Sequence, residues 1–450
     1  MANNYNAGSV QLCKCLYCLK KFRPANAPFR TTTVYTMQDF DNFTNEEKQE
    51  KEPFLEAADP VLGEFWSRFP NSQPKSDYDK RPVLSNTDPR YLKGVYKRDA
   101  EGFVNEAIDG EGRSTKVRIC PLCHNVLPFE FGKYPVKYIA VVGITSSGKT
   151  VYLSQMLKKI KEILARVNYS VVGGYSEIEA FTESREITKG KPLPKSNTPD
   201  VFILPLPINV MNNATGKRYT LVFYDIAGEN CVNANNMEIY GRFVANADGI
   251  IMIVDPKQFT QLFFLPGVNA SEQVFSPEKV VEAMYDCFLS ANNTGGKSQV
   301  PLAATLSKSD LLREGGAFSE DSILFEDIHY EEYDKPGFPY DDFNEVQSEL
   351  ESVFKSKESM QGEIFVNALK QSFKNYAFFA FSALNCRAVR ATNSKGEAFS
   401  VIDEVPETIR IEESLLWIFH ELKLIGKVRR KKQQQDKQQQ KKKGLLGWGK

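Results

Sequence analysis

The sequence predicts an α/β fold in which helices cover both faces of a mostly parallel sheet. From about residue 135 onward, apolar runs of strand length alternate with segments of helical periodicity, as is typical of such sheets. The 450 residues are enough for two to three domains of about 150 residues each. Hydrophobic residues make up 42% and charged residues 25% of the chain, which is an ordinary globular composition.

Several protein classes are excluded at this stage. No apolar run approaches the roughly 18 residues that would suggest a membrane span. The first residues, MANNYNAGSVQL, lack the basic and then apolar layout of a secretory signal. We therefore expect a cytoplasmic protein that is neither an integral membrane protein nor a secreted or fibrous one.

The expected elements of the α/β region follow one another in order. A buried strand at Val136–Val142 precedes a helix over Thr150–Val167, whose apolar residues recur at helical spacing. Residues 172–199 are polar and rich in turn formers, so we expect a loop there. Ser276-Pro277 starts another helix, and a closing helix is expected from Pro406 to about Ile425. Further strands are expected at 201–210, 218–224, 249–254, 300–306 and 377–382.

A phosphate-binding motif lies between the first strand and the first helix. Residues 143–150 read Gly-Ile-Thr-Ser-Ser-Gly-Lys-Thr and fit the P-loop pattern G-x-x-x-x-G-K-[ST]. Backbone amides of such a loop and the positive end of the following helix bind phosphate oxygens. Lys149 is expected to reach the β- and γ-phosphates, and the Thr150 hydroxyl to ligate Mg²⁺. The candidate phosphate-binding residues are Gly143, Ser146, Ser147, Gly148, Lys149 and Thr150.

A second motif, Asp225-Ile-Ala-Gly228, follows the strand at 218–224. A carboxylate at this strand end can hold Mg²⁺ through a water molecule, and the amide of Gly228 can meet a γ-phosphate. This position after an apolar strand, downstream of a P-loop, indicates a site that senses the terminal phosphate.

Two further motifs indicate the base. Ser307-Lys-Ser-Asp310 follows the strand at 300–306, and Asp310 can accept two hydrogen bonds from guanine, whereas adenine offers no such donor pair. The stem of Lys308 would lie over the base. Ser382-Ala383 follows the next strand, where a backbone amide can meet the guanine carbonyl.

These four motifs, in this order, resemble those of the Ras-like and translation-factor-related (TRAFAC) class of P-loop GTPases, over about residues 135–425. The resemblance implies a P-loop NTPase sheet, GTP and GDP as ligands, Mg²⁺ as cofactor and hydrolysis of GTP. It implies phosphate and Mg²⁺ roles for the P-loop residues, Asp225 and Gly228. It also implies base recognition by Ser307, Lys308, Asp310, Ser382 and Ala383.

The chain departs from the pattern of that class at three places. Ser307 stands where the class usually has Asn or Thr, and Glu229 stands where many members have a water-orienting Gln. A long segment also separates Asp310 from Ser382, and its acidic part, at about 315–351, is expected to be either a solvated surface insertion or a partner-docking surface.

Other catalytic assignments are less constrained by the sequence. Thr198 is our candidate for the Mg²⁺-sensing threonine of the first switch loop, and Thr188 and Thr182 compete with it. Arg185 is the nearest candidate for an arginine finger. Without a glutamine next to Gly228, intrinsic hydrolysis is expected to be slow.

Two cysteine pairs, Cys15-x-x-Cys18 and Cys120-x-x-Cys123, predict a four-thiolate Zn²⁺ site of zinc-ribbon type. The ribbon would comprise residues 1–23 and 112–134 and be interrupted by an insertion over 24–111. Two short runs, Phe103–Ile108 and Thr115–Ile119, predict a hairpin. Cys13 and His124 are spare ligand candidates. The remaining cysteines and two other histidines are expected to be ordinary core or surface residues: Cys231, Cys287, Cys386, His329 and His420.

The C-terminal segment, 426–450, is expected to be a disordered basic tail after a GTPase domain over 135–425. Residues 427–450 hold ten Lys/Arg and one Asp, so their net charge is +9 and the rest of this neutral chain carries −9. The tail either solubilises the protein or anchors it to an anionic membrane surface, with Leu445, Leu446 and Trp448 inserted at the interface. Binding of nucleic acid by the tail is a third option.

The sequence as a whole predicts a GTP-binding protein that hydrolyses GTP slowly and reports its nucleotide state to a protein effector. It is expected in the cytoplasm, with peripheral membrane association left open. An ATP-dependent nucleic-acid remodeller is an alternative, against which stand Asp310 and the acidic body. A nucleotide-binding scaffold without turnover is the other alternative, for which Glu229 is the only indication.

Overall fold

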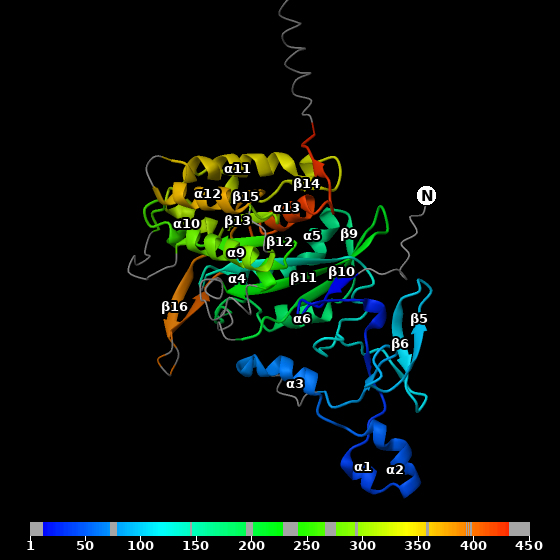
Figure 1. Cartoon of the computed structure of the whole chain (residues 1–450). Coiled ribbons are helices and arrows are strands. Elements are labelled where there is room, and N and C mark those ends of the chain that lie inside the picture. Colours follow the sequence, from blue (N-terminus) through cyan, green and yellow to red (C-terminus); the bar gives the residue numbers. More distant parts are fainter. Residues whose placement is uncertain are drawn as a thin grey trace, which may run out of the picture.

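The structure is a computed structural model that describes residues 12–72, 79–144, 146–194, 201–227, 242–265, 276–292, 296–356, 360–392, 394, 396 and 398–431 (Figure 1). A seven-stranded sheet with the order β15-β13-β12-β8-β11-β10-β9 lies at its centre. Its strands are β8 (Val136–Gly143), β9 (Tyr169–Gly173), β10 (Leu206–Asn212), β11 (Arg218–Ala227), β12 (Gly249–Val254), β13 (Leu302–Leu306) and β15 (Tyr376–Ala380).

The sheet is mostly parallel, as the sequence predicts. The strands from β15 to β11 are parallel to their neighbours, and β10 is antiparallel to both β11 and β9. Every residue of β12 and β13 is buried, which is the pattern of strands that are covered on both faces. The carboxyl ends of β8, β11, β13 and β15 therefore lie at one edge of the sheet, where the nucleotide motifs follow.

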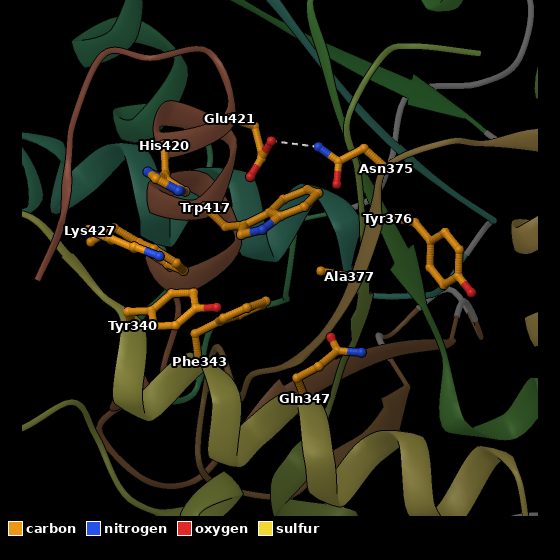
Figure 2. Close-up of a pocket in the computed structure, with 11 residues that line it drawn as sticks. Tyr340, Phe343, Gln347, Asn375, Tyr376, Ala377, Trp417, His420, Glu421 and Lys427 are labelled. Atoms are coloured by element: carbon orange, nitrogen blue, oxygen red, sulfur yellow. Dashed lines mark hydrogen bonds between the residues drawn. The ribbon is translucent and has the colours of Figure 1, made fainter. Parts of the chain in front are cut away.

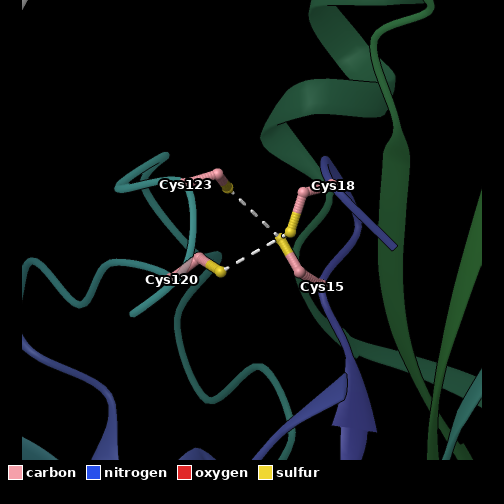
Figure 3. A group of neighbouring side chains, drawn as sticks. All are labelled: Cys15, Cys18, Cys120 and Cys123. Atoms are coloured by element: carbon pink, nitrogen blue, oxygen red, sulfur yellow. Dashed lines mark hydrogen bonds between the residues drawn. The ribbon is translucent and has the colours of Figure 1, made fainter. Parts of the chain in front are cut away.

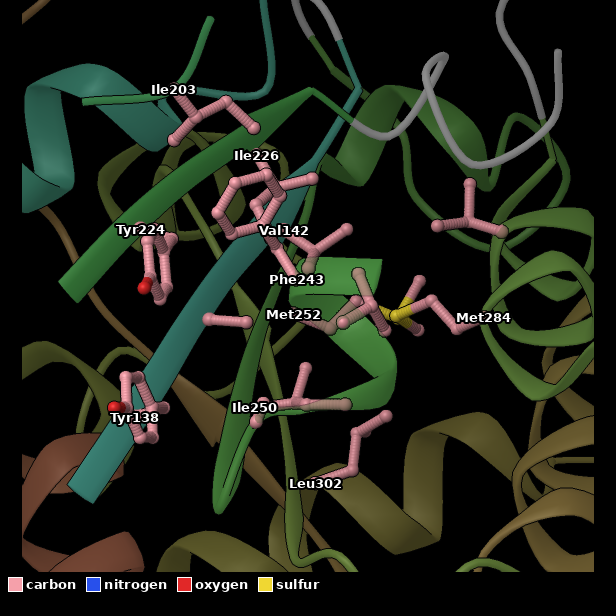
Figure 4. Packing of buried hydrophobic residues seen from close by; sticks show 14 of the residues in the cluster. Tyr138, Val142, Ile203, Tyr224, Ile226, Phe243, Ile250, Met252, Met284 and Leu302 are labelled. Atoms are coloured by element: carbon pink, nitrogen blue, oxygen red, sulfur yellow. The ribbon is translucent and has the colours of Figure 1, made fainter. Parts of the chain in front are cut away.

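Helices cover both faces of this sheet. On one face pack α9 (Pro277–Asn292), α11 (Tyr340–Phe354) and α12 (Met360–Ser372); on the other pack α4 (Lys149–Lys158), α5 (Ile160–Arg166), α6 (Ser176–Glu183) and α13 (Glu413–Glu421). Alternate residues of β8 serve the two cores, because successive side chains of a strand point to opposite faces. Figure 4 shows the first core, where Tyr138 and Val142 of β8 lie with Tyr224, Ile250 and Met252 of the neighbouring strands.

Some element boundaries differ from the sequence expectation. The segment 172–199, expected as a loop, contributes the end of β9 and all of α6, because Ile178 is buried and anchors one helical face. The helix expected over 150–167 divides into α4 and α5 at Lys159. The closing helix is confined to α13, because residues 407–409 instead exchange backbone hydrogen bonds with residues 382–384.

The acidic segment at about 315–351 is part of the helical layer. Its second half forms most of α11, whose Val346, Leu350 and Phe354 are buried in the core of the first face. One of its carboxylates, Asp342, is itself buried and forms an ion pair with Arg410 at 3.1 Å. The segment therefore contains both core side chains and surface acids. A count of charges alone does not reveal the core residues, because they stand at helical spacing between the acids.

The N-terminal part folds as small sheets and short helices (Figure 1). Its paired strands are β1 (Cys13–Lys14) with β2 (Lys21–Phe22), β3 (Phe29–Arg30) with β4 (Val83–Leu84), and the three-stranded set β5 (Val95–Arg98), β6 (Val104–Ile108) and β7 (Ser114–Thr115). The expected hairpin is present as β6 and β7, although Ile119 pairs with Val126 instead. The helices are α1 (Met37–Asp41), α2 (Asn45–Lys51) and α3 (Pro60–Ser67).

The C-terminal residues that the structure describes lie on the body of the domain. β18 (Lys427–Val428) pairs in parallel with β14 (Phe338–Pro339), and Arg429 forms an ion pair with Asp341 at 2.6 Å. Arg430 contacts Glu345 at 2.7 Å. The expected tail from 426 therefore begins with ordered residues, and 432–450 lie outside the described residues.

The remaining elements are short. α10 (Ser309–Glu314) follows β13, and the hairpin of β16 (Ala388–Thr392) and β17 (Ala398–Ile402) follows β15. The 3₁₀ turns are at Pro24–Asn26, Glu52–Phe54, Pro70–Ser72, Pro256–Gln258, Ile323–Phe325 and Tyr330–Glu332. In the part of the chain that the structure describes, none of the helices has the length and apolarity needed to cross a membrane.

Candidate functional site

The P-loop joins β8 to α4, as its sequence context predicts. Ser146 and Gly148 adopt left-handed backbone conformations, with φ of 67° and 90°. Gly143 has no room for a side chain, because a Cβ atom there would lie 2.7 Å from Ser147 Oγ and 3.0 Å from the Ile253 carbonyl. Ser147 Oγ is buried, and within the described residues it has no hydrogen-bond partner. The loop is thus tightly folded and offers a buried polar atom to a ligand.

Three buried side chains meet beside this loop. Lys149 Nζ lies 2.9 Å from Asp225 Oδ1, and Thr150 Oγ1 donates a hydrogen bond to Asp225 Oδ2 at 3.1 Å. Asp225 reaches this place because it stands near the end of β11, paired with Val141 in the register of β8. A hydroxyl and a carboxylate are hard oxygen donors of the kind that Mg²⁺ prefers, and the adjacent ammonium suits a phosphate.

The base-recognition motifs also lie together. Asp310 Oδ1 accepts a hydrogen bond from Ser382 Oγ at 2.6 Å, and Ser382 Oγ in turn accepts one from the Asn385 amide at 2.8 Å. Burial raises the pKa of Asp310 above its ordinary value, and the Ser382 hydrogen bond opposes this shift. Ala383 is buried next to Ser382, and its carbonyl accepts a hydrogen bond from Gln155 of α4 at 3.4 Å.

Lys308 connects the base motif to the P-loop. Its ammonium donates a hydrogen bond to the Ser146 carbonyl at 3.0 Å and forms an ion pair with Asp255 at 2.6 Å. Ser307 Oγ donates to the Val254 carbonyl at 3.2 Å, so it is held against the end of β12. The sequence analysis missed Asp255; its signal is the position of a carboxylate directly after a buried strand, at the same edge as the other motifs.

Several predicted residues are not available for this geometry. Thr198, Gly228 and Glu229 lie outside the described residues, as does Cys231. Of the alternatives, Thr182 of α6 is half-buried, and its hydroxyl donates to the Glu179 carbonyl at 3.0 Å. Thr188 follows α6 with a buried hydroxyl.

Arg185 lies at the end of α6 beside the P-loop helix. Its carbonyl accepts a hydrogen bond from Ser154 of α4 at 3.3 Å, and its guanidinium lies 4.1 Å from the centre of the Phe181 ring. Burial lowers the pKa of Arg185, and the charge of the Asp225 carboxylate opposes this shift.

A second cluster is formed by the four cysteines of the two C-x-x-C pairs (Figure 3). Their sulfur atoms all lie within 4.8 Å of one another. The Sγ–Sγ distances are 3.8 Å for Cys15–Cys123 and 3.9 Å for Cys18–Cys120. Tetrahedral Zn²⁺ with Zn–S bonds of about 2.3 Å requires sulfurs about 3.8 Å apart, so the arrangement fits this ion.

Each cysteine pair occupies a tight turn between paired strand segments. The first lies between β1 and β2, and the second lies between Ile119 and Val126, which form an isolated bridge. Backbone amides of Tyr17 and Leu122 donate to the sulfurs of Cys15 and Cys120, at 3.3 and 3.4 Å. Such N–H···S hydrogen bonds stabilise and orient thiolates that bind a metal ion.

The spare ligand candidates are used elsewhere. His124 Nδ1 lies 2.7 Å from Asp59 Oδ2, and its other ring nitrogen lies 3.3 Å from the Tyr91 hydroxyl. Cys13 lies against Gly132, and burial raises the pKa of its thiol to about 12. Cys287 is buried in α9 and Cys386 is partly exposed. His329 lies near surface glutamates, and His420 stacks on Phe338 with ring centres 5.5 Å apart.

A hollow of about 380 Å³ lies at the amino-terminal end of β15 (Figure 2). Tyr340 and Phe343 of α11, Trp417 of α13 and Lys427 surround it, and Glu421 accepts a hydrogen bond from Asn375 at 2.5 Å. Because the nucleotide motifs follow the carboxyl ends of the strands, this hollow is separate from them.

Comparison with known proteins identifies related sequences. The family model described as Double-GTPase 2 matches residues 137–368. A Mycolicibacterium smegmatis protein with the provisional name ESX-1 scaffolding and assembly protein SaeC is 28% identical over 149 residues, which are 31% of this chain and 38% of that protein. This chain therefore matches well under half of the length of that relative.

Two solved structures show a distant likeness. One is the Arl6 BBS3 small GTPase of Trypanosoma brucei with a bound nucleotide analogue, at 12% identity and a TM-score of 0.25 over 65% of this chain and 99% of that one. The other is a bacterial selenocysteine-specific elongation factor, EF-Sec, at 12% identity and a TM-score of 0.25 over 65% of this chain and 29% of that one.

Proposed function

The chain belongs to the double-GTPase 2 family, and from that premise we propose that it is a guanine-nucleotide switch that hydrolyses GTP slowly and reports its nucleotide state to a protein effector. The observation that carries the proposal is the contact of Lys149 and Thr150 with Asp225, together with the Asp310–Ser382 pair that Lys308 ties to the P-loop. These contacts lie at one edge of the sheet, and they support the roles that we propose for these residues toward phosphate, Mg²⁺ and base.

We assign the phosphate end of the nucleotide to the P-loop. Lys149 would neutralise charge on the β- and γ-phosphates, and backbone amides of the loop would bind their oxygens. Thr150 would ligate Mg²⁺ directly and Asp225 would hold it through water, since both side chains already share one contact. The bound ion would supply charge neutralisation at the phosphates.

The base end would select guanine. The Asp310 carboxylate would accept from the two donors of the base, Lys308 would cover it with its stem, and the backbone at Ser382 and Ala383 would meet its carbonyl. Asp255 is a positioning residue in this scheme, because its ion pair with Lys308 aims the lysine toward the P-loop. This specificity argues against the alternative of an ATP-dependent nucleic-acid remodeller.

Slow turnover follows from the proposed water-positioning group. Glu229 would take the place of a neutral amide, and its charge next to the γ-phosphate opposes attack by water. Arg185 would be the cis cation closest to that site.

We also propose that the four-cysteine cluster binds one Zn²⁺ with a structural role. All four ligand positions would be protein thiolates, so no position is left for a reacting water. Nothing in this arrangement calls for redox or catalytic chemistry at the zinc.

A nucleotide-binding scaffold without turnover is a second candidate. It is favoured by the similarity to a protein that is named for scaffolding and assembly, although the match covers 31% of this chain. In this case Glu229 would block hydrolysis completely and GTP binding alone would control assembly.

One set of measurements separates these candidates. We expect GTP and GDP to compete with labelled GDP, and ATP to compete poorly. Purified protein should hydrolyse GTP at about 10⁻⁴ to 10⁻² s⁻¹, the range of unassisted GTPases. Glu229→Ala should keep nucleotide binding and change this rate, and Lys149→Ala should lose binding. If ATP competes as well as GTP, the guanine assignment is wrong. If the protein hydrolyses several GTP molecules per second, the proposal of slow hydrolysis is wrong. Absence of GTP hydrolysis would support the scaffold candidate.

A further inference from the structure

The N-terminal module, residues 12–134, packs on two aromatic residues of the GTPase domain, Phe202 and Tyr224, and a third, Phe243, packs on both of them. Phe202 follows the switch candidate Thr198 by four residues, Tyr224 directly precedes Asp225, and Phe243 follows the Asp225 motif along the chain. We propose that the two cysteine turns, at 15–18 and 120–123, and α3 form a metal-dependent clamp on Phe202 and Tyr224 and, through them, on Phe243. Metal occupancy of the turns thereby sets the rate of nucleotide release. The inference rests on the proposed GTP-binding function.

Phe202 is the centre of the clamp. It is buried, and its ring contacts four aromatic rings of the N-terminal module, with centre-to-centre distances of 4.7 to 6.2 Å; these belong to Tyr17, Phe65, Trp66 and Phe69. Its backbone amide donates a hydrogen bond to Ser72 Oγ. Phe202 also contacts Phe243, with ring centres 5.9 Å apart. One aromatic cluster therefore joins the chain segments around Phe202 and Phe243.

The first cysteine turn contacts this cluster directly. Tyr17 stands between Cys15 and Cys18, stacks on Phe202, and donates its backbone N–H to Cys15 Sγ at 3.3 Å. The neighbouring Leu16 carbonyl accepts a hydrogen bond from the Tyr224 hydroxyl at 2.8 Å, in a fully buried position. The residue before Asp225 is thus bonded to a residue inside the metal-binding turn.

The second cysteine turn holds α3. Asn125 donates to Cys123 Sγ at 3.4 Å and accepts from Trp66 Nε1 at 3.0 Å, so it bridges a metal ligand to the helix. His124 holds Asp59 at 2.7 Å, and Asp59 caps the first turn of α3 by accepting from Val61 and Leu62 at 3.0 and 3.1 Å. The start and the last turn of α3 are therefore both held by residues that follow Cys123.

Metal should matter because α3 cannot hold its place alone. The helix has eight residues, which is too short to be stable without tertiary contacts. The two cysteine turns are 101 residues apart in sequence, and a shared ion would tie them together. Loss of the ion would loosen both supports of the aromatic cluster at once. The segments beside Asp225 and the switch candidate would then become more mobile, and nucleotide would leave faster.

Coupling of this kind is reciprocal. If metal slows the release of nucleotide by strengthening its binding, nucleotide must strengthen metal binding by the same factor. This gives a readout that does not depend on catalysis, namely the affinity for zinc, measured by equilibrium competition with a chelator with and without GDP·Mg²⁺.

The experiment uses the full chain loaded with zinc and a fluorescent GDP. We expect removal of zinc to accelerate GDP release about tenfold, a typical allosteric coupling. Trp66→Phe keeps an aromatic ring but loses the hydrogen bond to Asn125, and should accelerate release about threefold with zinc still bound. Tyr96→Phe is the matched control. It also removes one hydrogen-bond donor from the N-terminal module, namely the Tyr96 hydroxyl, which bonds to the carbonyls of Ala27 and Leu84. This hydroxyl lies outside the clamp. The Tyr96→Phe variant should leave release unchanged.

The outcomes separate the clamp from a general loss of structure. Because the metal-free module can unfold, the zinc-loaded Trp66→Phe variant is the decisive test. If this variant releases GDP at the wild-type rate, the clamp is wrong. The clamp is also wrong if Tyr96→Phe accelerates GDP release as much as Trp66→Phe does. An equal affinity for zinc with and without GDP·Mg²⁺ also overturns it. If the zinc-loaded wild-type protein binds no guanine nucleotide, the proposed function fails, and the role of the clamp in nucleotide release fails with it. If the protein binds GDP tightly but its release rate depends neither on zinc nor on Trp66, only the clamp is refuted.

Discussion

Asp310 is the residue whose chemistry decides between nucleotides. Its carboxylate accepts a hydrogen bond from Ser382 at 2.6 Å, and Lys308, directly before α10, is bonded to the P-loop, so the acceptor is pre-positioned. Burial raises the pKa of Asp310, and a base that donates two hydrogen bonds would compensate the cost of keeping the carboxylate charged.

Exchange of this acceptor for a donor should change base preference. We expect Asp310→Asn to weaken GTP binding by roughly 10- to 100-fold, the discrimination of one bidentate pair, and to improve binding of xanthosine triphosphate. Competition against labelled GDP and labelled XDP measures both changes. Glu314→Gln, the same chemical change at an exposed position of α10, is the control. An unchanged preference in Asp310→Asn would show that the base is read elsewhere.

Glu413 is a buried carboxylate at the start of α13. It lies 3.1 Å from Arg410, and Asp342 and Glu412 are the neighbouring acids. Burial raises its pKa from 4.5 to about 7, although Arg410 opposes the shift. Its folded-state pKa is thus above the unfolded one, so between pH 4.5 and 7 the folded state binds more protons.

Stability should therefore fall as the pH rises through this window. The contribution of Glu413 to the free energy of unfolding is expected to decrease by at most about 3 kcal/mol between pH 4.5 and 7. Glu413→Gln should flatten this part of the pH dependence, as measured by denaturant unfolding at pH 5, 6 and 7. Parallel pH profiles of the variant and the wild type would contradict the assignment.

At the scale of elements, the two cysteine turns are supported by very little regular secondary structure. β1, β2 and the bridge at Ile119 are very short, and their pairing alone cannot fix the sulfur positions. The amides and the Asn125 side chain that point at the sulfurs support thiolates, which a metal ion would require.

We expect close to one zinc per chain by elemental analysis. Cys120→Ser should lose the metal and lower the thermal stability of the N-terminal module by several degrees, since a thiolate ligand is replaced by a weaker donor. Cys13→Ser is the control, because Cys13 is adjacent in sequence but lies against Gly132 outside the cluster. A metal-free wild-type protein with the same melting temperature as Cys120→Ser would exclude a structural zinc.

At the scale of the whole molecule, the sequence predicted local patterns well and long-range packing poorly. The parallel strands, the P-loop context and the β6–β7 hairpin follow from apolar runs and turn residues that act over a few positions. The sequence suggested a zinc module separate from the nucleotide domain. In the structure, Cys15, Leu16 and Trp66 share a core with Tyr138 and Tyr224 of the sheet.

That joint core could not be predicted because no periodicity records it. The aromatic residues Phe65, Trp66 and Phe69 pack on Phe202, which is more than 130 residues away in the sequence. Asp255 was missed for the same reason, since its role depends on Lys308 in the neighbouring strand's loop. The acidic helix α11 was obscured by its charge, although Val346 and Leu350 carry the helical period.

The basic residues of the C-terminal segment fall into two groups, one paired with acids of the domain and one in the tail that follows. Arg429 and Arg430 already pair with Asp341 and Glu345, so their charge is locally compensated. Residues 432–450 hold six more Lys/Arg and one Asp, followed in part by Gly-Leu-Leu-Gly-Trp. Basic residues near an anionic surface contribute about 1 kcal/mol each, and inserted apolar side chains add to this.

Deletion of 432–450 should therefore abolish sedimentation with vesicles that contain anionic lipid, while the body keeps its fold and its Arg429 and Arg430 contacts. Full-length protein should sediment at low salt and be released at about 0.5 M salt, because screening shortens the reach of each charge. Neutral vesicles are the control, on which neither protein should sediment. If the full-length protein fails to bind anionic vesicles at low salt, or binds as well after the deletion, the tail is not an anchor and its charge serves solubility alone.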